Sequence, residues 1–247
     1  MKVQRKGAAR TQRNLLAAAS EVFAEKGYRD ATIAEICERA GANVAAVNYH
    51  FGDKETLYKE AWRHAFSESL KAHPPDGGVR EDAPPEERLR GQVKALLRRI
   101  SDENNKEFVF VQKELASPTG LLDEVIHKEI RHLLEEMETL VRELLGGRAS
   151  DTEVRFCVIS IISQCINPMV STNGRRQRRE GKGGPPGVDD IEAYADHVLR
   201  FSFAGIRAIR GEAQEKQREQ IDAIFLKTLQ RAIRAEAEEK DNGLKKQ

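Results

Sequence analysis

Apolar residues recur every three or four positions along most of the chain, which is the spacing that places side chains on one face of an α-helix. The first such pattern begins at Thr11 and includes Leu15, Val22 and Phe23. Gly27 follows it, and glycine is typical of the left-handed residue that ends a helix. The pattern predicts a first helix from Thr11 to about Gly27.

Two short helices are predicted next. Thr32 and Glu35 have the spacing of a capping box, in which the hydroxyl and the carboxylate each accept from a free N–H group of the first turn. Gly41 ends this helix, and Asn43 is a suitable N-cap for a third helix over residues 44–51.

The rest of the chain also predicts helices. A fourth helix follows Gly52-Asp53, and the segment 73–85 then holds four prolines and two glycines, which indicates a connection between two units. Six further amphipathic or apolar stretches are predicted to be helical: 89–100, the stretch around 108–116, 121–145, 154–170, 191–209 and 217 to about 240. The fold class expected is all-α, with a helical unit over 11–71 and a larger helical unit over 86–240.

Composition and charge narrow the classes of function. Lys and Arg total 41 against 40 Asp and Glu, a net charge of +1, which excludes a globally basic coat protein. The most apolar stretch, 154–170, is interrupted by polar residues and falls short of the ~18 consecutive apolar residues of a membrane span. The basic N-terminus lacks the apolar core of a secretory signal, so a cytoplasmic location without membrane contact is expected. Three cysteines without a CxxC pair fit a reducing compartment and do not predict a zinc site.

Basic residues gather in two segments. Residues 1–13 hold five Lys or Arg and no acid, and we interpret 1–10 as a flexible basic arm that either contacts a polyanion or serves as a solubilising terminus. Residues 173–187 combine Gly and Pro with four Arg and one Lys against one Glu, which predicts a mobile loop.

The segment 32–54 carries the strongest functional signal. Two short helices joined by Gly41-Ala42-Asn43 have the spacing of a helix-turn-helix. A count of 100° per residue predicts that Val44, Val47 and Phe51 pack inward. The same count predicts that four residues face outward: Ala45, Ala46, Asn48 and Tyr49. The alternative is a plain three-helix unit in which this outward face is only solvated.

The outward face suits entry into a major groove. Two alanines let the backbone approach closely, and Ala45 is placed to meet a thymine methyl group. Asn48 can read adenine bidentately, while the Tyr49 hydroxyl and Lys54 are placed for phosphate oxygens. Thr32 and Asn43 begin helices, where free N–H groups bind phosphate.

The chain resembles the tetracycline-repressor (TetR) family of bacterial transcriptional regulators over residues 11–62. The resemblance depends on twelve residues in order and spacing: Phe23, Gly27, Tyr28, Thr32, Ile36, Ala40, Gly41, Tyr49, Phe51, Lys54, Glu55 and Leu57. It implies an all-α homodimer whose third helix enters the major groove of a double-stranded palindromic operator. It also implies DNA contacts for six residues: Asn43, Ala45, Asn48, Tyr49, His50 and Lys54. The sequence departs from the common pattern at Asn43 and at Ala46 to Asn48, so the operator sequence is not implied.

The resemblance further implies that the C-terminal half dimerises and binds a small-molecule effector, which would make the protein a repressor that its effector releases. Stretches 154–170 and 191–209 are more apolar than surface helices need to be, which favours a four-helix dimer interface over a helix pair buried within one subunit. Six residues are candidates for the effector pocket, each with simple core packing as its alternative: Phe108, Phe110, His127, Cys157, Gln164 and Cys165.

An enzyme and an adaptor that uses the last helix as a partner surface are the alternative classes. His127 and His132 are five residues apart and do not share a helix face as metal ligands four apart would. The chain has no GxSxG, HExxH, P-loop or GxGxxG after a strand. No enzymatic activity, cofactor or metal is therefore expected.

Overall fold

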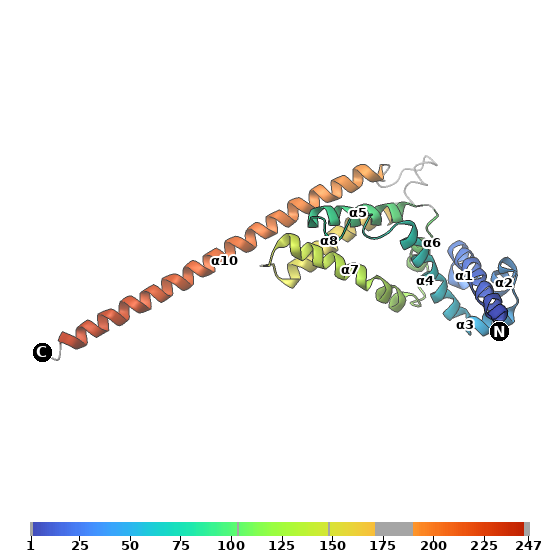
Figure 1. Cartoon of the computed structure of the whole chain (residues 1–247), viewed down its shortest axis with the longest axis horizontal. Coiled ribbons are helices and arrows are strands. Elements are labelled where there is room, and N and C mark those ends of the chain that lie inside the picture. The colour runs from blue at the N-terminus through green and yellow to red at the C-terminus, as the bar shows by residue number, and fades with distance from the viewer. Residues whose placement is uncertain (1, 103, 148, 171–189, 245–247) are drawn as a thin grey trace.

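The computed structural model describes residues 2–102, 104–147, 149–170 and 190–244, and over these ranges it is helical, without a strand (Figure 1). The predicted fold class is confirmed. The helices are α1 (Lys2–Asp30), α2 (Ile33–Ala40), α3 (Val44–Phe51), α4 (Lys54–Ala72), α5 (Pro85–Ser101), α6 (Lys106–Ala116), α7 (Asp123–Leu145), α8 (Asp151–Val170) and α10 (Ile191–Leu244).

Helices α1 to α4 form a compact unit at one end of the molecule (Figure 1). Phe23 on α1, Ile36 on α2 and Val47 on α3 are fully or almost fully buried in its core together with Trp62 of α4. α1 is kinked near its C-terminal end at Gly27, whose φ of 78° lies in the region that favours glycine. Short connections and one shared core therefore fix the orientation of α3.

The N-terminal unit shares its core with α6 and the start of α7. Phe110 of α6 is fully buried and stacks on Tyr58 of α4, with ring centroids 5.4 Å apart, and it meets Phe23 of α1 at 6.3 Å. Leu122 and Val125 belong to the same buried cluster. The two predicted units are thus packed against each other rather than joined only by the connection after α4.

A second core holds the C-terminal body together. Four helices surround it: α5, α7, α8 and α10. Leu97 of α5, Val141 of α7 and Leu199 of α10 are fully buried there, and Val154 and Ile161 supply the inward face of α8.

Two helices differ in extent from those predicted. α1 begins at Lys2 rather than Thr11, so the described part of the expected basic arm consists of the first turns of this helix. α10 runs without a break from Ile191 to Leu244, where the sequence predicted two helices. A single Gly211 costs a helix only about 1 kcal/mol, which does not interrupt it. The predicted loop 173–187 lies outside the described residues.

α10 has 54 residues, which at 1.5 Å per residue gives a length of about 80 Å. Its first half packs on the C-terminal body and its second half projects away from the molecule, on the side opposite the N-terminal unit (Figure 1).

The connection between α4 and α5 folds back onto α5 at a pair of glycines. Gly77 has a φ of 63°, and a Cβ atom at Gly91 of α5 would overlap the carbonyl oxygen of Asp76. The turn can therefore lie directly against the α5 backbone only because both positions lack a side chain.

We expect Gly91→Ala to lower the free energy of unfolding by about 1–3 kcal/mol, because the new methyl group forces the turn away from α5. Gly211→Ala is the matched control, since a Cβ atom there meets no atom within 4 Å and alanine favours the helix by about 0.5–1 kcal/mol. Thermal unfolding followed by circular dichroism measures both. An equal melting temperature for Gly91→Ala and the unsubstituted protein would contradict the close approach.

Candidate functional site

The surface of α3 is set by its cap and its buried face. The Oδ1 atom of Asn43 accepts a hydrogen bond from the N–H of Ala46 at 2.9 Å, so Asn43 is the N-cap as predicted. Val47 and Phe51 are buried, which turns Asn48 and Tyr49 outward. The Tyr49 side chain is 80% exposed. α3 therefore presents an amide and a phenol on a short, otherwise apolar helix.

Two positions of α3 differ from the predicted faces. Val44 was expected to pack inward, yet it is 49% exposed. Ala46 was expected to face outward with Ala45, yet it is half-buried and packs against the core. Both lie in the first turn, where the cap residue sets the direction of entry and a count of 100° per residue from the helix centre is least reliable.

The cap of α2 is half of the predicted capping box. Thr32 Oγ1 accepts from the N–H of Glu35 at 3.2 Å. The Glu35 carboxylate does not return to the cap, because it accepts from Lys26 at 2.7 Å and from Arg39 at 3.0 Å instead. The Thr32 side chain is exposed at the start of α2.

Lys54 and His50 lie beside this surface. Lys54 Nζ stands 4.6 Å from the centre of the Tyr28 ring and 3.5 Å from the carbonyl oxygen of Arg29, so it interacts with the end of α1. Partial burial lowers the pKa of Lys54, against the opposing effect of Asp30. His50 is half-buried and meets Tyr49 edge-to-face at 4.9 Å.

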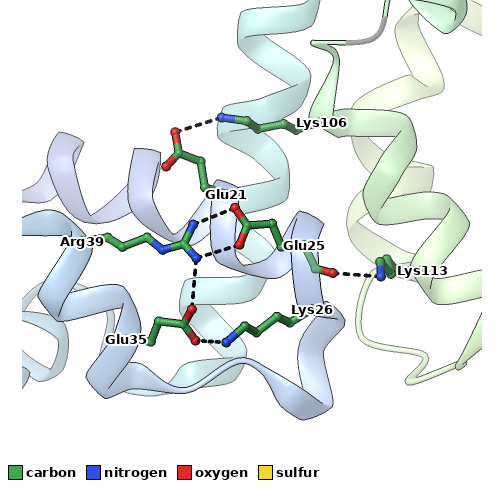
Figure 2. Close-up of polar contacts among 7 residues, drawn as sticks. All are labelled: Glu21, Glu25, Lys26, Glu35, Arg39, Lys106 and Lys113. Carbon is green, nitrogen blue, oxygen red and sulfur yellow. Dashed lines mark hydrogen bonds and ion pairs between the residues drawn. The ribbon is translucent and has the colours of Figure 1, made fainter.

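An ion-pair cluster joins α1 to α2 (Figure 2). Arg39 of α2 donates to both carboxylate oxygens of Glu25 on α1, at 2.7 and 2.6 Å, and Lys26 pairs with Glu35. Hydrogen bonding to Arg39 lowers the pKa of Glu25, and hydrogen bonding to Lys26 lowers that of Glu35. These contacts hold the helix that precedes α3.

The cluster continues to α6 of the C-terminal body (Figure 2). Lys106 lies 3.3 Å from the Glu21 carboxylate, and Lys113 donates to the backbone oxygen of Glu25 at 2.9 Å. α1 is therefore held by α2 on one side and by α6 on the other. Sequence reasoning did not find these pairs, because the residues of each are far apart in the sequence and all carry ordinary surface charges.

A cavity of about 220 Å³ lies in the C-terminal body. Its walls come from the connection after α4 and from α5, α6, α7 and α8, and most of its side chains are apolar. The lining residues are His73, Pro75, Gln92, Ala95, Leu96, Arg99, Phe108, Val111, Ile126, Ile130, Leu133, Leu134, Glu136, Met137, Ile162 and Ile166.

One of the six residues predicted for the pocket lines this cavity, namely Phe108. Phe110 belongs to the N-terminal core, and His127 is exposed on α7. Cys157 and Cys165 are buried in the C-terminal core. Gln164 is half-buried and donates to the Ser160 carbonyl oxygen of its own helix.

Arg99 is the cavity residue that sequence reasoning missed. It is only 6% exposed, and its guanidinium group lies between the rings of Phe66 and Phe108, at 5.7 and 5.6 Å. Its Nε atom is 3.5 Å from the Oε2 atom of Glu107, which is also buried. A signal was present, because Gln92 and Arg99 stand seven residues apart on one face of the predicted helix, with Ala95 and Leu96 between them.

α8 and α10 also carry apolar side chains on the outside of the subunit. Phe156 and Ile159 of α8 are 62% and 53% exposed, and Phe201 of α10 is 63% exposed. Each helix thus buries one apolar face in its own subunit and exposes another. Among the described residues, no helix is long and apolar enough to cross a membrane.

Two family models match the chain. Residues 15–61 match the model described as bacterial regulatory proteins of the TetR family, and residues 85–206 match the C-terminal domain of the transcriptional dual regulator CecR. Together they cover both the unit that contains α2 and α3 and the body that contains the cavity.

Individual proteins agree with these models. The chain is 28% identical over 168 residues to the dual regulator CecR of Shigella flexneri, which covers 63% of this chain and 74% of that protein. It is 34% identical over 92 residues to the transcriptional repressor NicS of Pseudomonas putida, covering 37% of this chain and 42% of that protein. The crystal structure of a TetR-like regulator from Rhodococcus sp. RHA1 superposes with a TM-score of 0.56 at 15% identity, over 80% of this chain and 96% of the other.

Three findings lead to one conclusion: a capped two-helix unit with an exposed face on α3, a helical C-terminal body, and matches to both family models. The chain belongs to the TetR family of bacterial transcriptional regulators, and its function is to bind DNA.

Proposed function

We propose that the protein is a dimeric repressor that binds a palindromic operator in the cytoplasm and is released by a small molecule bound in the cavity of the C-terminal body. The observation that carries this proposal is the position of the cavity. Its wall includes Arg99, which packs on Phe66 of α4, and His73, which caps the end of the same helix.

The reading face consists of Ala45, Asn48 and Tyr49 on α3. Asn48 is exposed and can meet the edge of a base, and the exposed phenol of Tyr49 is placed for a phosphate oxygen. The α-helix N-termini at Thr32 and Asn43 supply free N–H groups toward the DNA backbone. We assign His50 and Lys54 to backbone contacts beside this face, and Ala46 to packing that lets α3 lie close to its neighbours.

Dimerisation supplies the second reading helix. One α3 reads only a few base pairs, whereas two copies about 34–36 Å apart read two half-sites. The apolar side chains of Phe156, Ile159 and Phe201 form an exposed surface over α8 and α10 that suits a four-helix contact with a second copy.

Release requires that the cavity and α3 are mechanically connected. α4 begins at Lys54, immediately after α3, and ends at Ala72, beside the cavity. At that end Ser69 accepts from Asn105 at 2.8 Å, and Asn105 also donates to the Arg99 carbonyl oxygen. A ligand that shifts Arg99 therefore acts on the C-terminal end of the helix whose N-terminal end adjoins the reading helix.

Contacts to bases and contacts to phosphates are expected to respond differently to substitution. Asn48→Ala should reduce discrimination at one base pair by about 1–3 kcal/mol, whereas Lys54→Ala and Tyr49→Ala should weaken binding to every sequence. Lys54→Ala should also reduce the slope of log affinity against log salt concentration by about one.

The measurement is selection of bound fragments from random DNA, followed by fluorescence anisotropy at several salt concentrations. Lys71→Ala is the control, because Lys71 lies at the far end of α4 and pairs with Glu68. Unchanged base preference in Asn48→Ala would show that the reading face is assigned wrongly.

Replacing Phe156 and Phe201 together by Asp is expected to convert the dimer into a monomer, because two charges would then be buried in an apolar interface. Light scattering coupled to size-exclusion chromatography gives the molar mass directly. Leu115→Asp is the matched control, since Leu115 is 67% exposed on α6, away from α8 and α10. If the double variant remained a dimer while Leu115→Asp became a monomer, the interface would lie elsewhere.

Filling the cavity is expected to desensitise the protein to its effector. With the most effective releasing compound from a metabolite panel, Leu134→Trp should raise the concentration for half-release from the operator by about tenfold or more, because overpacking costs about 1–3 kcal/mol. Operator affinity without the compound should stay within about twofold, since Leu134 of α7 lines the cavity, whereas α3 packs against α1, α2 and α4. His127→Trp, on an exposed position of the same helix, is the control. An unchanged response in Leu134→Trp would exclude this cavity as the effector site.

A further inference from the structure

Arg99 is a buried charge beside an apolar cavity. A guanidinium group has five N–H donors, and the buried Nε atom of Arg99 has no hydrogen-bond partner among the described residues. The rings of Phe66 and Phe108 lie against its faces and accept no conventional hydrogen bond. Burying a charged donor without an acceptor is costly, so this arrangement favours a ligand that supplies one.

Glu107 compensates the charge of Arg99 but does not complete its hydrogen bonding. The Arg99 Nε and Glu107 Oε2 atoms are 3.5 Å apart, and neither has a hydrogen-bond partner among the described residues. Burial raises the pKa of Glu107, against the lowering effect of Arg99, so this carboxylate takes up a proton more readily than an exposed one. The Arg99 side chain therefore keeps an unpaired donor for an acceptor from a ligand.

The cavity has a polar group at each end of one wall. Gln92, Ala95, Leu96 and Arg99 follow one another along the same face of α5, and Gln92 and Arg99 are about 10 Å apart at 1.5 Å per residue. The wall between them is apolar, and the wall from α7 is apolar except for Glu136. A ligand that fits this shape has one polar head at Arg99 and an apolar body along α5.

A second cavity adjoins the first on the side of Gln92. It has a volume of about 590 Å³, shares Gln92, Leu133 and Glu136 with the first cavity, and is also lined by Arg88 and His132. Arg99 does not line it. The two cavities adjoin each other, and in the first, apolar one Arg99 is the only Arg or Lys among the lining residues.

We propose that the effector is an apolar carboxylic acid whose carboxylate accepts hydrogen bonds from Arg99 while its hydrocarbon part lies between α5 and α7. This inference rests on the proposed function, since it assigns a ligand class to the same cavity. A carboxylate matches the planar fork of a guanidinium with two oxygens, which an alcohol does not, and an amine would meet a like charge.

Isothermal titration of the full chain without DNA tests the class directly, with octanoate, octan-1-ol and octylamine as probes. The three share one alkyl chain and differ in the head group. Octanoate is expected to bind at least about tenfold more tightly than octan-1-ol, because a charge-assisted hydrogen bond replaces a neutral one, and octylamine should bind most weakly.

Two double variants test whether the preference for octanoate over octan-1-ol depends on Arg99. Arg99→Met with Glu107→Gln removes both charges of the buried Arg99–Glu107 pair. The affinities for octanoate and octan-1-ol should then differ by less than about twofold. Arg88→Met with Glu143→Gln is the matched control, because Arg88 lines the second cavity and pairs with Glu143 at the same 3.5 Å separation, and it should keep the preference for octanoate. If the control variant loses the preference for octanoate, or if the Arg99→Met, Glu107→Gln variant keeps it, the assignment to Arg99 is overturned.

The single variant Glu107→Gln keeps the test decisive if the Arg99→Met, Glu107→Gln double variant does not fold. It removes the competing carboxylate from Arg99, so octanoate should bind more tightly, while octan-1-ol should change by less than about twofold. Unchanged or weaker octanoate binding overturns the proposal, as does equal or undetectable binding of octanoate and octan-1-ol to the unsubstituted protein.

These outcomes are separate from those of the proposed function. Release of the operator is measured with DNA and the Leu134→Trp variant, whereas the head-group preference is measured without DNA. If the effector were neutral and Leu134→Trp blocked its action, the cavity would still be the effector site, and only the assignment of a carboxylic acid would be overturned.

Discussion

The packing of α6 into the N-terminal core is the constraint on which the rest of the structure depends. Phe110 lies against Phe23 and Tyr58, so a helix of the C-terminal body is part of the hydrophobic core that positions α3. Aromatic contacts of this kind are stabilised both by buried area and by ring geometry. A connection made through a packed core transmits a displacement, whereas a flexible linker would absorb it. The N-terminal unit and the body therefore cannot change their relative orientation without repacking this cluster.

The polar contacts around that core join neighbouring helices in pairs. Arg39, Glu25 and Lys26 hold α2 to α1, while Lys106 and Lys113 hold α1 to α6. Within the body, Arg99 packs on the α4 side chain Phe66 and on Phe108 of α6 at once. α3 thus packs on an apolar core whose other helices are joined by ion pairs, and α6 takes part in both that core and the cavity wall.

Local chemistry explains which parts of this arrangement could be predicted from the sequence. The caps at Thr32 and Asn43 and the glycine at position 41 act within a few residues, so their patterns predict helix ends directly. The burial of Val47 and Phe51 follows from helical periodicity. Val44 and Ala46 were assigned to the wrong faces, because the entry angle of a two-turn helix depends on its neighbours rather than on its own period.

The cavity could not be predicted in the same way, because it is formed by segments that are distant in the sequence. Phe108 and Phe110 are two residues apart, so they point away from each other on α6: one lines the cavity and the other fills the N-terminal core. Nor did the sequence distinguish a buried Arg99 from the exposed Arg98 beside it, which pairs with Glu192 of α10. Only the packing of α4 and α6 around it determines that difference.

The exposed ion pairs between α1 and α2 have a consequence for how the protein senses its ionic surroundings. Dissolved ions weaken attraction between exposed charges, and they do so for pairs inside the protein as well as for those between protein and nucleic acid. Arg39, Glu25 and Glu35 join α1 to α2, and both helices contact α3, so the same ions loosen the support of α3. The decline of affinity with ionic strength therefore combines two effects, and the number of displaced counterions inferred from it exceeds the number of phosphates that the protein touches.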